Sequence, residues 1–164
     1  MPMRLINSIR RNHALEHATI AVMMTRQGPM RVVGRASADG FYVYGDVSTE
    51  HLRAFADEAL GRLQKGESHL AVSPLCGTNL LVAGVIAGVG SYLAAGTGKK
   101  RFDGLANALL AAIVGVLASQ PIGRLIQKHG TTSPDLEGVR IVSVERMGRR
   151  LAKLHKVRTA FTAA

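Results

Sequence analysis

Two long uncharged runs in the middle of the chain constrain its fold more than any other feature. No Asp, Glu, Lys or Arg occurs from Ser68 to Gly98, or again from Gly104 to Gly123. At about 1.5 Å of rise per residue, each run can form a helix that crosses a hydrocarbon core of about 30 Å. The polar sequence GTGKKRFD between them is typical of a tight turn. We therefore predict a transmembrane helical hairpin over residues 77–127.

A buried helical hairpin in a soluble domain is the alternative interpretation. Glycine is dense in both runs, which weakens a helix in water but is tolerated in a bilayer. Small residues also recur at four-residue spacing, and such faces let membrane helices approach closely. These pairs are Gly84–Gly88, Ala108–Ala112 and Ala111–Gly115. The pattern favours the membrane hairpin, with a kink or an exit from the bilayer near Pro121.

The charge distribution predicts an orientation. The formal net charge is +10, with 9 of the Lys and Arg residues before Gly77, 3 in the turn and 9 from Arg124 onward. The positive-inside rule then predicts the inner (plasma) membrane with both termini in the cytoplasm. The N-terminus lacks the apolar core of a signal peptide, and a single cysteine fits a reducing compartment. An anionic leaflet explains the basic charge, and scarce aromatic residues argue against a nucleic-acid partner.

The segments on either side of the runs predict a small cytoplasmic α+β domain of order α-β-β-α-β(-β), into which the hairpin is inserted. Apolar spacing, β-rich runs and turn residues define its elements. We predict a helix over 4–25, a β-hairpin over 30–47, a helix over 48–63, a strand over 69–73 and a strand over 139–145. The last strand has to join the same sheet, which again places both ends of the hairpin on one side.

The predicted divisions follow from this order. They are residues 1–76 for the cytoplasmic domain, 77–127 for the hairpin, 128–146 for the loop and strand that complete the sheet, and 147–164 for a basic tail. The chain from Arg146 onward holds six cations and no acid, and its apolar residues can line one side of a helix. This pattern suits an amphipathic helix on anionic lipid headgroups or a solvated tail, and both interpretations stay open.

The chemistry begins at His13, Glu16 and His17, which form an H-x-x-E-H pattern on one face of the first predicted helix. Two imidazoles one turn apart can bind one divalent metal, and the glutamate can be a ligand or a general base. Inverzincin proteases use this order of residues. The alternative is a structural trio paired with the sheet or with Arg10 and Arg11, because polar groups on a buried face need partners.

A second polar block, PLCGTN, lies at the start of the first run. Its Cys76 is the only thiol of the chain, and a thiolate is a good zinc ligand. Thr78 and Asn79 can cap the helix that follows. The hairpin would bring His129, after the second run, to the same membrane face. We predict a Zn²⁺ site whose metal ligands are His13, His17 and Cys76. Glu16 is the predicted base, or instead the third ligand or a group that orients a ligand.

The blocks HALEHATI and PLCGTNLL, the two-span hairpin and TTSPDLEGVRIVSV resemble a family of small uncharacterised bacterial membrane proteins known as a domain of unknown function. The resemblance covers about Asn12–Val144. It implies a two-span membrane protein without naming a reaction.

The same two blocks are similar to those of a larger family of predicted metal-dependent membrane enzymes, with H-G-A-E-H-K and H-P-R-C-G-T-S blocks before an apolar span. This likeness covers only the two blocks. It implies a site at His13, Glu16, His17 and Cys76. The histidine that begins the second block is Ser73 here, so the resemblance implies a lost ligand or a substitute at His69 or His129.

Two functions follow as hypotheses. The first is a zinc-dependent hydrolase that acts on a peptide, amide or lipid-linked substrate. The second is a non-catalytic accessory or assembly subunit whose glycine-rich hairpin packs in a larger membrane complex or a homo-oligomer, with a pigment-binding variant in which histidine is an axial ligand. The expected partners are the lipid bilayer, anionic headgroups at the basic tail, and such a complex, but no nucleic acid.

Overall fold

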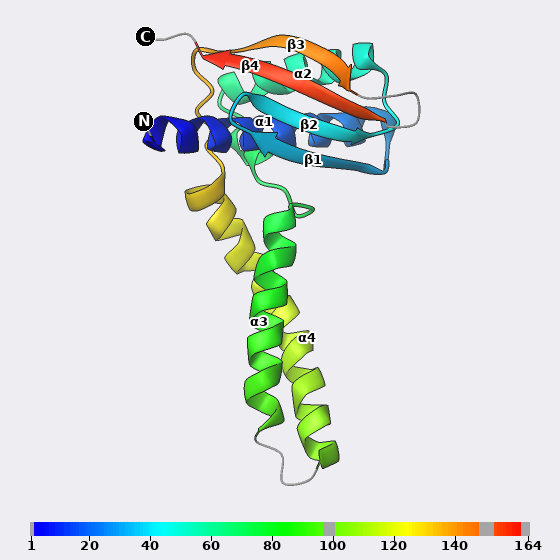
Figure 1. Cartoon of the computed structure of the whole chain (residues 1–164), viewed down its shortest axis with the longest axis vertical. Coiled ribbons are helices and arrows are strands. Elements are labelled where there is room, and N and C mark those ends of the chain that lie inside the picture. Colours follow the sequence, from blue (N-terminus) through cyan, green and yellow to red (C-terminus); the bar gives the residue numbers. More distant parts are fainter. Residues whose placement is uncertain (1, 97–100, 148–152, 162–164) are drawn as a thin grey trace. The chain divides into compact units, whose positions relative to one another are not determined.

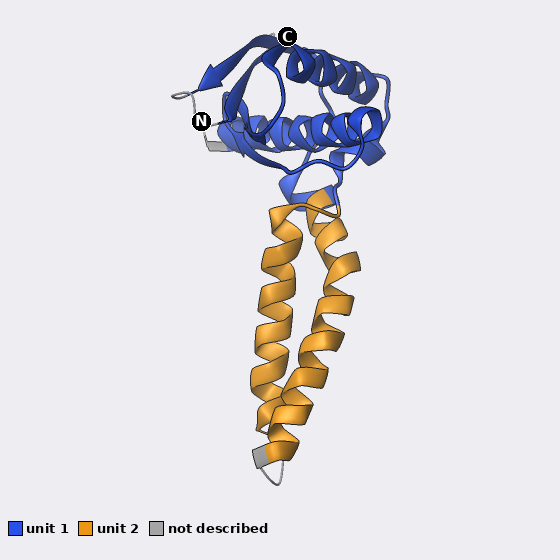
Figure 2. Cartoon of the chain, turned by 90° about the vertical axis from the view of Figure 1, so that its right-hand side faces the viewer, with its two compact units in different colours: residues 1–73, 128–164 blue, residues 74–127 orange. Residues whose placement is uncertain are grey.

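The computed structural model describes residues 2–96, 101–147 and 153–161, and it divides into two compact units. Unit 1 consists of residues 1–73 and 128–164, and unit 2 of residues 74–127 (Figure 2). The lysines of the predicted turn, Lys99 and Lys100, lie outside the described residues, as does the beginning of the basic tail at 148–152.

Unit 1 is an α+β domain with one four-stranded antiparallel sheet of order β1-β2-β4-β3. The strands are β1 (Val32–Ser37), β2 (Gly40–Gly45), β3 (Val139–Met147) and β4 (Leu154–Phe161). Helices α1 (Pro2–Gln27) and α2 (Thr49–Gln64) pack together against one face of the sheet (Figure 1). Between these layers lies the core, whose fully buried side chains include Leu15, Phe41, Val43, Leu52 and Val157.

The predicted order of helix, β-hairpin, helix, apolar helical hairpin and strand is confirmed. Local signals explain most boundaries. The hydroxyl of Ser48 accepts a hydrogen bond from the backbone N–H of His51 at 3.1 Å and caps α2. Gly40 closes the β1–β2 turn with φ +137°, and a Cβ there would collide with the carbonyl of Val157 on the neighbouring strand. The turn therefore requires glycine.

The predicted strand over residues 69–73 is wrong. The segment forms a short 3₁₀ helix, η1 (Ser68–Ala71), whose Leu70 and Ala71 enter the core. This segment contacts α1, away from any sheet edge. Because no strand lies beside this segment, its backbone groups cannot form the hydrogen bonds of a sheet. The segment forms a 3₁₀ turn instead.

Both interpretations of the tail, an amphipathic helix and a solvated tail, are wrong for its described residues, because Leu154–Phe161 forms β4 between β2 and β3. Its apolar residues fit a helical spacing, but they also fit strand alternation. Val157 pairs with Phe41 on the helix-covered face, and Lys156 pairs with Tyr42 on the other face. Burial between two strands decides the outcome over local spacing.

A buried lysine joins β4 to the β1–β2 turn. The Lys156 ammonium is almost fully buried and donates to the Ser37 hydroxyl at 2.6 Å and to the Asp39 carboxylate at 2.7 Å. It also lies 4.0 Å from the ring centroid of Tyr42. Hydrogen bonds from Lys156 and then Ser37 hold the pKa of Asp39 below its ordinary value of 3.8. The charge of the lysine is thus compensated inside the sheet.

Replacing Asp39 with asparagine is expected to lower the free energy of unfolding by about 1 kcal/mol at neutral pH, since more than half of the Asp39 side chain is exposed and solvent screens it. A lowered folded-state pKa stabilises above pH 3.8, and this contribution is lost as pH falls through the folded value. Chemical unfolding in detergent should show the difference vanishing in strong acid. Asp57→Asn, in an exposed pair with Arg53, is the control; an equal loss in both variants would contradict the assignment.

Unit 2 is a helical hairpin. It consists of α3 (Gly77–Ala95) and α4 (Arg101–Ile126), and a π-helical turn, η2 (Gln127–Thr131), follows α4. Both helices are long and apolar enough to cross a membrane, and only 6% and 11% of their most apolar stretches are buried. A core helix of a soluble domain would be mostly buried. Helix α4 continues past Pro121 for a further turn and ends at Ile126.

The two helices touch through small residues of α4. A Cβ on Gly115 would lie 2.9 Å from Cα of Ala87, and one on Gly104 would lie 2.7 Å from the carbonyl oxygen of Ala95. Gly84 and Gly88 have open space beside them. Of the small-residue pairs in the sequence, Ala111–Gly115 therefore lies where the two helices meet, whereas Gly84–Gly88 does not.

Polar side chains close one end of the hairpin. The Gln127 amide is buried and donates to the Asn79 side-chain oxygen at 2.7 Å. The Asn79 amide donates to the carbonyl of Pro74 at 3.1 Å. A Cβ on Gly123 would collide with the Asn79 amide, so glycine makes the space for this network.

Candidate metal centre

Two histidines lie one turn apart on the buried stretch of α1. His17 is 3% exposed and His13 is half-buried. Their ring centroids are 4.3 Å apart with the planes inclined at 60°. This stretch of α1 is fixed on unit 1, because the Asn12 amide donates to the carbonyls of Ser37 and Ala38. The imidazole pair therefore belongs to a rigid part of the fold.

Backbone carbonyls orient both rings. Nδ1 of His17 lies 2.8 Å from the carbonyl oxygen of Ala71, and Nδ1 of His13 lies 3.0 Å from that of Thr131. A carbonyl only accepts, so each Nδ1 carries the hydrogen. A neutral ring then has its lone pair on Nε2, which is the usual arrangement of a metal-binding histidine held by a carbonyl.

The Nε2 atom of His17 is buried, and it has no hydrogen-bond partner among the described residues. A buried polar atom without a partner costs about 1–3 kcal/mol. Together with the orientation imposed by Ala71, this leaves a lone pair in the interior with nothing else to bind. A metal ion would satisfy it.

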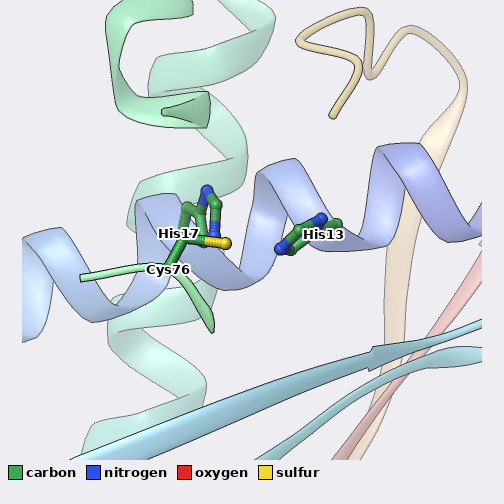
Figure 3. Close-up of side chains that lie close together, drawn as sticks. All are labelled: His13, His17 and Cys76. Atoms are coloured by element: carbon green, nitrogen blue, oxygen red, sulfur yellow. The ribbon is translucent and has the colours of Figure 1, made fainter. Parts of the chain in front are cut away.

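Cys76 is the third member of the group. The metal-capable atoms of His13, His17 and Cys76 all lie within 4.8 Å of one another (Figure 3). The Cys76 sulfur also accepts from the backbone N–H of Thr78 at 3.4 Å as the cap of α3, a position that favours negative charge on sulfur. Only a few residues separate Cys76 from Ala71, so the segment that orients His17 leads directly to the thiol.

The other predicted site residue, Glu16, is buried on α1. Its carboxylate lies against Gly34 of β1, where any Cβ would collide with it. Glu16 is not among the metal-capable residues grouped with His13 within the described chain. The substitutes considered for the missing histidine, His69 and His129, are exposed and do not belong to the group either.

Several features of the site escape sequence reasoning. The Ala71 and Thr131 carbonyls that orient the histidines leave no side-chain signal. Arg10 donates to the carbonyls of His129 and Thr132 at 3.0 and 3.2 Å, and so holds the Thr131 loop in place. The cations of the first helix could suggest such a clamp, but not its partners.

One further buried histidine, His155, lies on β4 outside the group. Burial, and then the nearby charge of Arg146, lower the pKa of His155 from 6.5. His155 is thus neutral at pH 7 and offers an internal comparison for the α1 histidines.

Comparison with known proteins gives a family but no reaction. Residues 8–144 match the profile of a family described as "Domain of unknown function (DUF6391)". The chain is 32% identical to an uncharacterized protein of Picosynechococcus sp. (strain PCC 7002), over 76% of this chain. It spans 66% of the length of that relative, which is slightly less than two thirds. No solved structure matches the chain significantly.

Proposed function

We propose that this chain, which belongs to the DUF6391 family, is a membrane-anchored protein that binds one Zn²⁺ ion through His13, His17 and Cys76. One observation carries the proposal: two backbone carbonyls leave Nε2 as the lone-pair atom of two histidines one turn apart, and this atom of His17 is buried without another partner in the described structure. Two imidazoles and a thiolate form a donor set that zinc favours.

The number of ligands supports catalysis as the use of the metal. Structural zinc sites are closed by four protein ligands, whereas catalytic sites keep three and leave one position for water or substrate. The described residues group three metal-capable side chains. Zinc lowers the pKa of its water to about 7, which favours hydrolysis of an amide, peptide or lipid-linked ester.

Glu16 has a proposed role as the base that takes the proton of this water. Its spacing from His13 and His17 supports the role. Its contact with Gly34 places the side chain on the sheet side of α1, so the base would have to reach the water from there. The likeness of the two blocks to predicted metal-dependent membrane enzymes favours the same class, with Ser73 accounting for one fewer ligand.

Cobalt substitution tests the open position. Chain purified in detergent and reconstituted with Co²⁺ should show a sulfur-to-cobalt charge-transfer band and visible bands that change when azide is added. Glu16→Gln should keep both signals. A Co²⁺ spectrum of four protein ligands that azide does not change would contradict the hydrolase hypothesis, and absence of any spectrum would contradict the metal site.

One observation favours a second candidate, a non-catalytic subunit of a larger assembly. The face of α3 at Gly84 and Gly88 is open, and small residues allow close approach of another membrane helix. In this version a second copy of the chain packs there. Gly88→Leu would then abolish a cross-linked dimer in detergent, and an unchanged monomer–dimer ratio would exclude it.

We also propose that α3 and α4 cross the inner membrane with both termini in the cytoplasm. Both helices are almost entirely exposed, and more cations lie outside the turn than in it; both facts support this topology. A cysteine introduced at Gly98, in a Cys76→Ser background, should react with an impermeant maleimide from outside the cell. Labelling only after lysis would reverse the orientation.

A further inference from the structure

We propose that the first two turns of α1, residues 3–9, lie in the headgroup region of an anionic bilayer as an interfacial anchor. The inference rests on the membrane location proposed above but not on the metal site. It assigns the lipid-surface role to a part of the chain other than the basic tail.

The apolar residues of this segment are exposed. Met3, Leu5, Ile6 and Ile9 are 75%, 53%, 54% and 37% exposed, whereas α1 is largely buried from Asn12 to Met23. A step of about 100° per residue places this stripe on the face of His13 and Ile20, across the helix from the buried Leu15, Ala18 and Val22. No element covers the stripe at residues 3–9 in the described structure.

The polar residues of the same turns occupy the opposite side. At 100° per residue, Met3, Leu5, Ile6 and Ile9 share one half of the helix, and Arg4, Asn7 and Ser8 share the other. The chain carries three cations before Glu16 and no acid, and the first turn of α1 contains no acid. An apolar stripe beside cations is the pattern of helices that lie in the plane of an anionic lipid surface.

Hydrogen bonds inside unit 1 tie the part of α1 that directly follows this segment to residues shortly after α4 in the sequence. The backbone N–H of Ser133 donates to the carbonyl of Arg10 at 3.0 Å. The Arg10 side chain donates to the His129 carbonyl, and His13 donates to that of Thr131. Helix α4 ends at Ile126 and η2 begins at Gln127, so these partners lie within a few residues of the end of the second apolar helix in the sequence. The apolar stripe ends at Ile9, directly before Arg10.

A protein partner is the competing occupant of the stripe, and lipid is the better fit. A lipid surface needs only an apolar stripe beside cations and a nearby bilayer. The stripe and the cations are present, and the proposed span brings the chain to the bilayer. A helix of this kind inserts about 5–10 Å below the headgroups. That depth is within reach of bromine atoms attached near the top of an acyl chain.

A single tryptophan provides the test, since the chain has none. Three full-length variants, Ile6→Trp, Val33→Trp and Val85→Trp, are reconstituted as one copy per nanodisc in phosphatidylcholine and phosphatidylglycerol, with or without brominated phosphatidylcholine. All three positions are exposed apolar residues, on α1, the sheet and α3 respectively. We expect bromine to quench Ile6→Trp and Val85→Trp, with blue-shifted emission, and to leave Val33→Trp unchanged.

The outcomes separate the anchor from the hairpin. Quenching of Val85→Trp with none at Ile6→Trp would overturn the anchor while the span stands. A blue shift at Ile6→Trp without quenching would mean that protein covers the stripe, which also overturns it. No quenching at Val85→Trp would instead remove the membrane location on which the inference rests.

Discussion

His17→Ala is expected to reduce bound zinc from about one ion per chain to nearly none. The variant removes the one buried Nε2 atom that lacks another partner in the described structure, and a site with one imidazole and one thiolate has too few ligands to hold the ion. It also leaves the Ala71 carbonyl without its donor, which costs about 1–3 kcal/mol. Elemental analysis of chain purified in mild detergent without chelator measures the first effect.

A matched control separates loss of metal from loss of fold. His155→Gln also replaces a buried histidine of unit 1, but one outside the metal-capable group. It should reduce stability to a similar extent and keep the zinc. If both variants retain zinc, or if the wild type contains none, His13 and His17 are buried scaffolding and the proposed function fails.

Gly115→Leu is expected to separate the hairpin helices and to destabilise unit 2 by about 1–3 kcal/mol, the usual cost of overpacking. A Cβ at this position already lies 2.9 Å from Cα and 3.1 Å from N of Ala87, and backbone atoms cannot rotate away. The variant should lower the melting temperature in detergent, followed by circular dichroism.

Gly88→Leu is the matched control for this prediction, with both variants compared in the monomeric fraction so that a contact between two copies at Gly88 plays no part. It makes the same substitution on the other helix, where a Cβ meets nothing within 4 Å. Both changes raise helix propensity equally, so a difference between them reports contact between the helices. Equal melting temperatures would contradict the packing of α4 against α3 at Gly115.

Much of the fold could be predicted from patterns that a single segment carries. Charge-free runs of membrane length predict α3 and α4, and β-rich runs around Asp39 and Gly40 predict the β1–β2 hairpin. The predictions fail where contacts with residues distant in the sequence determine the secondary structure. The β4 sequence suggests an amphipathic helix, because a lysine at position 156 is expected to face water. In the sheet, Lys156 is instead paired with Asp39 and Ser37.

The candidate metal site could likewise be predicted only in part. Spacing alone brings His13 and His17 onto one helix face, and thiol chemistry alone singles out Cys76. The orienting carbonyls of Ala71 and Thr131 could not be predicted, since they depend on where the 3₁₀ turn and the π-helical turn place the backbone. Which glycines touch the opposite helix likewise depends on the rotation of α3, which a run without a polar face does not encode.

The central claim is that two imidazoles and one thiolate hold the same ion. Zinc K-edge X-ray absorption on the purified wild-type chain tests it most directly. We expect one sulfur at about 2.3 Å from the zinc and nitrogen or oxygen neighbours at about 2.0–2.1 Å, with the sulfur lost in Cys76→Ser. A shell of light atoms without sulfur, or a spectrum that Cys76→Ser does not change, would contradict it.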